Sequence, residues 1–178
     1  MIKNLLVTGP PGCGKTTLVR RVVQELGDLP MAGFYTEEIR EGRVRAGFAL
    51  VGLDGKRSVL SHVRFPGPRR VGRYGVDIDG FEAFLGALPF GDPGLRLLVI
   101  DEIGKMECLS GYFRSFLIAR LESPVPVLAT IALRGTPSIE EIKKRPDVRI
   151  VTMSGENREE KFREVLGEIR HIVGGKGD

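Results

Sequence analysis

The sequence GPPGCGKTT, which runs from Gly9 to Thr17, decides how the rest of this 178-residue chain is interpreted. It matches the pattern G-x-x-x-x-G-K-[ST] of the phosphate-binding loop (P-loop) through Gly9, Gly14, Lys15 and Thr16. The run before it is short and apolar, as a buried parallel strand would be, and apolar residues recur at helical spacing after it. The order of strand, glycine-rich loop and helix is the context that a P-loop requires.

The residue types in this loop suit the binding of a triphosphate. Glycines let the backbone curl so that successive N–H groups point at one anion, and the next helix adds the partial positive charge of its N-terminus. We expect Lys15 to reach the β- and γ-phosphate oxygens, where it assists catalysis, and the Thr16 hydroxyl to ligate Mg²⁺. The residues expected to bind the nucleotide are Gly9, Pro10, Pro11, Gly12, Cys13, Gly14, Lys15, Thr16 and Thr17.

A second motif lies at Asp101 and Glu102, which follow the apolar run 97–100. A buried parallel strand delivers its last residues to the crevice at the carboxyl edge of the sheet, where the P-loop also opens. Asp101 is then placed to hold Mg²⁺, directly or through water. Glu102 is predicted to be the catalytic base, which orients or deprotonates the attacking water. This second carboxylate favours hydrolysis over transfer of phosphate to another acceptor.

Strands alternate with helices along the chain, which predicts an α/β fold with a mainly parallel sheet. A turn signal at Asp54-Gly55 predicts an antiparallel β insertion over residues 43–62. No linker divides the chain, so we expect one domain over residues 1–178. The further strands are expected at residues 31–40, 95–100, 125–131 and 148–152, and the further helices are expected to begin at Asp79, Met106, Ser138 and Asn157. Residues 64–75 are expected to be irregular, and the tail from Gly174 is expected to be frayed.

Composition excludes several classes of protein. The apolar and charged fractions, 42% and 28%, are those of an ordinary globular chain, and no apolar stretch is long enough to span a bilayer. Because only two cysteines are present, neither a disulfide framework nor a zinc cluster is expected. The net charge of +4 suits a polyanionic ligand but falls short of a nucleic-acid signature. The apolar start of the sequence, without a basic signal segment, predicts a cytoplasmic protein, and the scarcity of side-chain amides hints at a heat-loving source.

Weaker candidates lie on the loops around the predicted site. Lys105 and Arg134 could touch phosphate oxygens, and Thr130 lies where such proteins sense the γ-phosphate, although each is equally explained as a surface or packing residue. The loop arginines Arg69, Arg70 and Arg73 could act as an arginine finger, but loop arginines are commonly surface charge. The other residues that have both a functional and a structural explanation are Glu37, Glu38, Tyr74 and Arg158. His62 and His171 lack the spacing of metal ligands.

Five segments together resemble a known family. They are GPPGCGKTTL at the start, GFYTEEIREGRVRAGF at residues 33–48, RVGRYGVD at 70–77, VIDEIGKME at 99–107 and RPDVRIVTMSGENR at 145–158. In these segments the chain resembles the small nucleoside-triphosphatase family that includes the cancer-related nucleoside triphosphatase. The resemblance covers nearly the whole chain, and the middle segments are more specific than the P-loop itself.

The resemblance implies a Mg²⁺-dependent enzyme that hydrolyses ATP, GTP and other nucleoside triphosphates to diphosphate and phosphate, slowly and with broad base tolerance. It also implies a P-loop NTPase with a RecA-like, three-layer fold, and a monomer that does not bind membranes. Two alternatives stay open from the residues alone. One is a small nucleotide or nucleoside kinase, and the other is a nucleotide-gated RNA-binding switch, which the modest charge does not favour.

Overall fold

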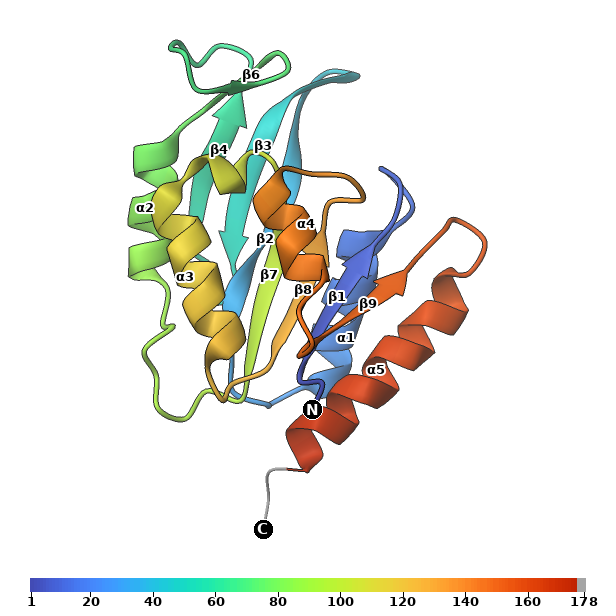
Figure 1. Cartoon of the computed structure of the whole chain (residues 1–178). Coiled ribbons are helices and arrows are strands. Elements are labelled where there is room, and N and C mark those ends of the chain that lie inside the picture. Colours follow the sequence, from blue (N-terminus) through green and yellow to red (C-terminus); the bar gives the residue numbers. More distant parts are fainter. Residues whose placement is uncertain (176–178) are drawn as a thin grey trace.

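A nine-stranded sheet runs through residues 1–175, the part of the chain that the computed structural model describes (Figure 1). The strands are β1 (Asn4–Thr8), β2 (Met31–Glu41), β3 (Val44–Gly52), β4 (Arg57–His62), β5 (Arg70–Val71), β6 (Tyr74–Val76), β7 (Leu97–Ile103), β8 (Val127–Ile131) and β9 (Val148–Thr152). Their order in the sheet is β5-β6-β4-β3-β2-β7-β8-β1-β9. The P-loop strand β1 is therefore separated from β7, which carries Asp101 and Glu102, by β8 alone.

The sheet is mixed rather than mainly parallel as the sequence predicted. Strands β2, β7, β8, β1 and β9 pair in parallel. Strands β2 to β6 pair antiparallel, so the antiparallel part accounts for as many strand pairs as the parallel part. The expected insertion at residues 43–62 is confirmed as β3 and β4, but it continues into a further hairpin, β5–β6, within the segment expected to be irregular.

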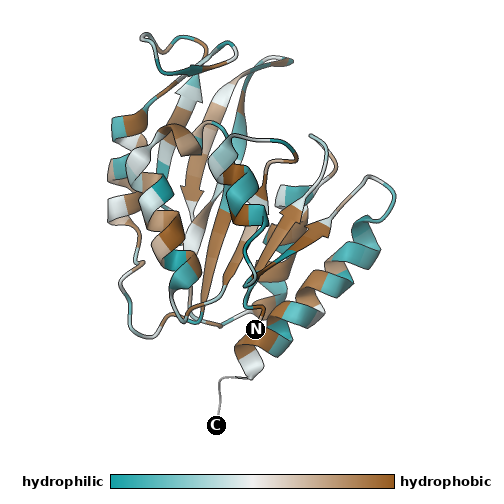
Figure 2. Cartoon of the chain, in the orientation of Figure 1, coloured by the Kyte–Doolittle hydropathy of each residue, from teal (hydrophilic) through white to brown (hydrophobic). Residues whose placement is uncertain are grey.

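Helices cover both faces of the sheet. They are α1 (Lys15–Leu26), α2 (Ile78–Ala87), α3 (Gly111–Glu122), α4 (Pro137–Lys143) and α5 (Arg158–Gly174), with a short 3₁₀ helix η1 (Glu107–Leu109). Buried residues of α2, α3 and α4 form one core with one face of the sheet, and those of α1 and α5 form a second core on the other face. The apolar strands lie between outward-facing polar helix surfaces (Figure 2).

Burial on both faces explains why the central strands read as continuous apolar runs. In β7, Leu98 and Ile100 pack into the core with α2 and α3, whereas Leu97 and Val99 pack into the core with α1 and α5. Successive side chains of a strand point to opposite faces, so a strand covered on both faces needs apolar residues at every position. The same strand continues past the apolar run through Asp101 and Glu102 to Ile103.

Three helix starts differ from those predicted. Helix α2 is capped by Asp77, whose side chain accepts from the Gly80 backbone N–H, and not by Asp79, which lies in the first turn. Helix α4 has Thr136 at its N-cap because Pro137, fixed near helical φ, occupies the first turn. The helix expected from Met106 is split into η1 and α3, and α3 is capped by Ser110.

The C-terminal helix α5 begins where the sequence predicted. Asn157 is at the N-cap of α5 as expected, although its side chain accepts from the Ser154 N–H and not from the helix. Gly174 is the last residue of α5 and Gly175 is its C-cap, so the first two residues of the tail expected to fray belong to the helix end. Residues 176–178 lie outside the described residues. Within residues 1–175, no helix combines the length and apolar character needed to cross a membrane.

Candidate functional site

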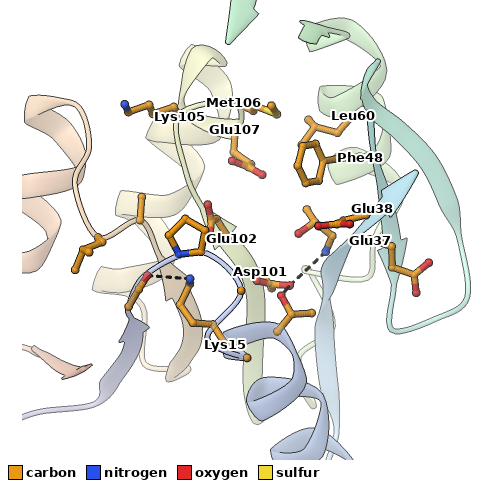
Figure 3. A pocket seen from close by; sticks show the side chains of 18 of the residues that line it. Lys15, Glu37, Glu38, Phe48, Leu60, Asp101, Glu102, Lys105, Met106 and Glu107 are labelled. Carbon is orange, nitrogen blue, oxygen red and sulfur yellow. Dashed lines mark hydrogen bonds between the residues drawn. The ribbon is translucent and has the colours of Figure 1, made fainter. Parts of the chain in front are cut away.

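The P-loop and the carboxyl ends of β2, β7 and β8 surround one cavity of about 980 Å³. Because these strands are parallel to β1, their carboxyl ends meet at the same edge of the sheet as the loop. Figure 3 shows Lys15 on one side of the cavity, with Asp101 and Glu102 between it and the side chains from β3 and β4. The two sequence motifs, more than eighty residues apart, therefore face each other.

The P-loop has the backbone shape that its glycines predicted. Gly14 has φ 104°, in the left-handed region, and α1 begins at the next residue. A Cβ at Gly9 would lie 2.3 Å from the carbonyl oxygen of Met153, so only glycine allows this close approach. The Lys15 ammonium donates to the carbonyl oxygens of Gly9 and Pro10 at 3.0 and 3.3 Å, which places it over the loop.

Asp101 is buried, with 1% of its surface exposed, and its carboxylate accepts from three donors. The Thr130 hydroxyl donates to Oδ1 at 2.5 Å, and the Thr16 hydroxyl donates to Oδ2 at 2.7 Å. The Thr36 backbone N–H donates weakly to Oδ2 at 3.4 Å. Burial raises the pKa of Asp101, and these hydrogen bonds offset only part of that rise.

Glu102 is directed differently from Asp101, to which a cis peptide bond joins it. Burial and the charge of Asp101 raise the pKa of Glu102, whereas the charge of Lys15 lowers it. The Glu102 carboxylate lies close to a second acid, Glu107, and both carboxylates approach Gly104. A Cβ built on Gly104 would lie 2.7 Å from Oε1 of Glu102 and 2.8 Å from Oε2 of Glu107. A side chain at position 104 would leave no room for this pair.

The residues present fit a magnesium ion held partly by phosphate and water. Thr16 and Asp101 offer hard oxygen ligands side by side, which is the donor type that Mg²⁺ prefers. A buried carboxylate with a raised pKa is stabilised by a nearby cation. Residues 1–175 contain no group of three or more acidic, His or Cys side chains that could hold a metal without other ligands.

Several of the weaker candidates line the cavity. Lys105 and Arg134 both line the cavity, and both are exposed. Glu37 and Glu38 also line it, but each is held by two arginines: Glu37 by Arg20 and Arg57, and Glu38 by Arg40 and Arg45. Thr130 is not among the residues that line the cavity, and its hydroxyl donates to the Asp101 carboxylate.

Other candidates lie elsewhere. Arg70 and Arg73 donate to backbone carbonyls of the β5–β6 hairpin and of β3, and neither they nor Arg69 line the cavity. Tyr74 packs edge-on against Phe48 at 5.4 Å, as expected for a tyrosine that covers core.

The two histidines have no role in this cavity. His62 is the last residue of β4, and its Nε2 lies 3.7 Å from Oε1 of Glu41. His171 lies in the last turn of α5. Neither lines the cavity.

Two residues near the motifs were not given a functional role from the sequence. Glu107 lines the cavity and is only 4% exposed. Burial and the charge of Glu102 raise its pKa well above the usual range. Arg158, considered only as a solvated residue, donates to the Gly12 carbonyl oxygen and lies against Gly14, so it borders the P-loop. The available signal was their position inside the specific segments VIDEIGKME and TMSGENR.

With this geometry in place, comparison with known proteins decides the family. A family model described as NTPase matches residues 4–166. The chain belongs to the NTPase family. Nucleoside-triphosphatase THEP1 of Thermotoga maritima is 39% identical over 174 residues, 97% of this chain and 99% of that protein. The human cancer-related nucleoside-triphosphatase is 43% identical over 176 residues, 89% of this chain and 92% of the human protein.

Solved NTPase structures agree with the fold described above. The crystal structure of THEP1 from the hyperthermophile Aquifex aeolicus superposes with a TM-score of 0.80 at 35% identity, covering 93% of this chain and 98% of that one. The solution structure of the human cancer-related nucleoside triphosphatase gives a TM-score of 0.77 at 38% identity, covering 95% and 98%. The similarity therefore includes both the parallel and the antiparallel parts of the sheet.

Proposed function

We propose that this NTPase hydrolyses the γ-phosphate anhydride of nucleoside triphosphates, including ATP and GTP, with Mg²⁺ as cofactor. The observation that carries the proposal is the arrangement of Lys15, Thr16, Asp101 and Glu102 around one cavity at the carboxyl edge of the sheet. A nucleotide-binding loop alone would serve many reactions. The half-buried Glu102 carboxylate, which lines the same cavity, would supply the base that hydrolysis needs.

Each residue of this arrangement has a separate task. The P-loop backbone, residues 9–17, and the Lys15 ammonium bind and orient the phosphates. Thr16 and Asp101 would hold Mg²⁺, which when bound would supply positive charge against the phosphates. Glu102 accepts the proton of the attacking water and orients that water toward the γ-phosphorus.

We also assign the chain to the P-loop NTPases with a RecA-like, three-layer fold. In support, β8 lies between the P-loop strand β1 and the carboxylate strand β7, and helices cover both faces of the sheet. One sheet that collects strands from residues 4 to 152 supports a single domain. We infer that the monomer is sufficient for hydrolysis because all the proposed groups come from one chain.

Slow turnover follows from the charges around the cavity. An arginine finger is worth about 10³–10⁵ in rate in related reactions. Of the cavity arginines, Arg20 and Arg45 are paired with Glu37 and Glu38, and Arg134 is exposed on the loop after β8. The triphosphate is therefore expected to lack a fixed guanidinium at the γ-phosphate.

Product analysis tests the proposal. The protein is incubated with ATP or GTP, with Mg²⁺ or with EDTA, and the nucleotides and free phosphate are quantified by ion-exchange chromatography. We expect equal amounts of nucleoside diphosphate and phosphate, formed only with Mg²⁺ and without an added acceptor. Diphosphate formation that requires an added nucleoside or nucleotide would instead support a kinase. Bound nucleotide that is never cleaved would refute hydrolysis by this chain alone.

A further inference from the structure

The cavity continues beyond the carboxylates of Asp101 and Glu102. Lys15 lies on one side of Asp101 and Glu102, and Phe48, Leu60 and Met106 lie on the other (Figure 3). The volume of about 980 Å³ is at the upper end of what small-molecule sites span, roughly 300–1,000 Å³. The cavity therefore has room for a second molecule beside a triphosphate.

The far side of the cavity has apolar walls. Phe48 comes from β3, Leu60 from β4, Val71 from β5, and Met106 from the turn before η1. The three strands belong to the antiparallel part of the sheet, which contributes nothing to the P-loop. We call this space the far subsite and define it by these four residues and Glu107. An apolar, concave space with few polar groups is the usual form of a small-molecule site.

Glu107 is the polar group of the far subsite. Its side chain is 4% exposed and extends into the space that faces Phe48 and Leu60 (Figure 3). Burial and then the charge of Glu102 raise its pKa well above the usual range. A protonated carboxyl in this position can both donate and accept a hydrogen bond.

The charges around the far subsite do not favour an ionic ligand. Glu38 at its edge is held by Arg40 and Arg45. The side chain of Lys105 extends away from Met106 and from the far subsite (Figure 3). Arg45 also lies at this edge, with its guanidinium carbon 5.4 Å from the centroid of the Phe48 ring, but it is already paired with Glu38. A charged molecule placed among the apolar walls would therefore lose hydration for little gain in charge pairing. A neutral molecule with a hydroxyl group would hydrogen-bond to the Glu107 carboxyl, beside the backbone N–H groups of Gly104 and Glu107 that already reach it, and would bury its apolar body.

We propose that the far subsite binds a neutral small molecule with an apolar body and a hydroxyl group, and that this hydroxyl, when the molecule is bound, competes with water as acceptor of the γ-phosphoryl group. The proposal rests on the proposed function, because it needs a triphosphate held by Lys15 with its γ-phosphate near Glu102. It goes beyond that function by adding a second substrate. Glu102 lies at the junction between the P-loop side and the far subsite (Figure 3).

The transfer step balances without another reactant. The hydroxyl oxygen forms a bond to the γ-phosphorus, and the bond from that phosphorus to the β,γ-bridging oxygen breaks. The bridging oxygen keeps the electron pair and leaves as part of the nucleoside diphosphate. The hydroxyl proton moves to the Glu102 carboxylate, which later releases it to solvent. The product is a phosphate monoester of the bound molecule.

Benzyl alcohol is the probe for binding, because it joins one aromatic ring to one hydroxyl. Saturation-transfer NMR measures its binding to the full-length protein with Mg²⁺ and a non-hydrolysable ATP analogue. Burial of one aromatic ring together with one hydrogen bond to Glu107 predicts a dissociation constant on the order of 1–10 mM. Met106→Asp places a charge in the apolar wall and should weaken binding about tenfold or more. Leu109→Asp is the matched control, since Leu109 lies in η1, is 40% exposed and does not line the cavity. Phe48→Ala replaces Met106→Asp if that variant does not fold.

The transfer step is measured with γ-labelled Mg·ATP in the presence of benzyl alcohol or ethanol. We expect labelled benzyl phosphate whose yield saturates at the concentration that saturates binding, and about tenfold less ethyl phosphate, because ethanol lacks the ring. Absence of binding up to about 50 mM, several times the expected constant, would overturn the proposal. So would equal binding by the Met106→Asp and Leu109→Asp variants, or bound benzyl alcohol with all label in free phosphate. Failure of the hydrolysis proposal has a separate readout, which is no phosphate release in samples without alcohol.

Discussion

Replacing Thr130 by valine tests whether the Asp101 carboxylate is held in place for a metal ion. Valine keeps the shape of threonine but removes the hydroxyl that donates to Asp101 Oδ1 at 2.5 Å. Thr130 is completely buried, so water cannot take over that hydrogen bond. Of the two remaining donors to Asp101, only Thr16 is close, because the Thr36 N–H lies at 3.4 Å. The carboxylate should therefore lose most of its fixed orientation on the Oδ1 side.

The size of the effect follows from two independent magnitudes. A hydrogen bond to a charged group contributes about 1.5–3 kcal/mol, and 1.4 kcal/mol is a factor of ten in an equilibrium constant. Loss of a group that orients a metal ligand typically weakens metal affinity about 10–100-fold. The two ranges agree. We predict that Thr130→Val raises the Mg²⁺ concentration needed for half-maximal activity by about 10–100-fold, while activity at saturating Mg²⁺ recovers most of its value.

The assay is phosphate release at a fixed nucleotide concentration, titrated with Mg²⁺. Thr8→Val is the matched control, because the buried Thr8 hydroxyl donates to the Ile131 carbonyl at 3.0 Å and not to a carboxylate. The control should lose about 0.5–1.5 kcal/mol of stability without a change in Mg²⁺ dependence. If Thr130→Val has the Mg²⁺ dependence of the wild type, or if both variants shift equally, then Thr130 is only a packing residue and the reasoning fails.

Three further predictions concern single side chains. The pKa of Glu107 is raised in the folded state, so its burial costs more stability as pH rises from the unfolded pKa of about 4.3 through the raised folded pKa. Glu107→Gln should therefore raise the melting temperature at pH 8 and lose that advantage near pH 4. An equal gain at both pH values would contradict this reasoning. Burial raises the pKa of the Cys108 thiol to about 12, and Cys13 is buried as well. Both thiols should therefore react with iodoacetamide at pH 8 only after unfolding. Rapid labelling of the native protein would show that they are not buried. Arg134→Ala should lower the maximal rate of hydrolysis about tenfold or less, because an exposed arginine is not a fixed arginine finger. The control is Arg163→Ala on α5. A loss of about 10³ relative to that control would show that Arg134 acts as an arginine finger.

The sequence predicted the parts of the site that depend on short-range patterns. The P-loop is recognisable because its glycines, lysine and threonine occur at fixed spacing between a strand and a helix. Asp101 and Glu102 could be placed because a buried strand leads to them and parallel strands share one carboxyl edge. The strand Val148–Thr152 was also predicted with its observed bounds, since turn signals flank it on both sides.

The parts that sequence could not supply depend on contacts between distant segments. Thr130 meets Asp101 only because β7 and β8 are neighbours, with Ile100 opposite Ala129 in the register. Glu107 lies in a segment that was predicted only as the start of a helix, and its burial arises from its place in η1 between the carboxylates and the core. The antiparallel part was underestimated because β5 and β6 have only two and three residues, too few for an alternating pattern.

The most direct test of the account compares Glu102→Gln with Glu160→Gln, a control at an exposed position on α5. Phosphate release from Mg·ATP and Mg·GTP is measured together with nucleotide affinity for both variants and the wild type. The account predicts that Glu102→Gln binds nucleotide normally while hydrolysis falls by about 10²-fold or more, the loss expected for a positioned base. Hydrolysis by Glu102→Gln at the rate of the wild type and of Glu160→Gln would contradict it.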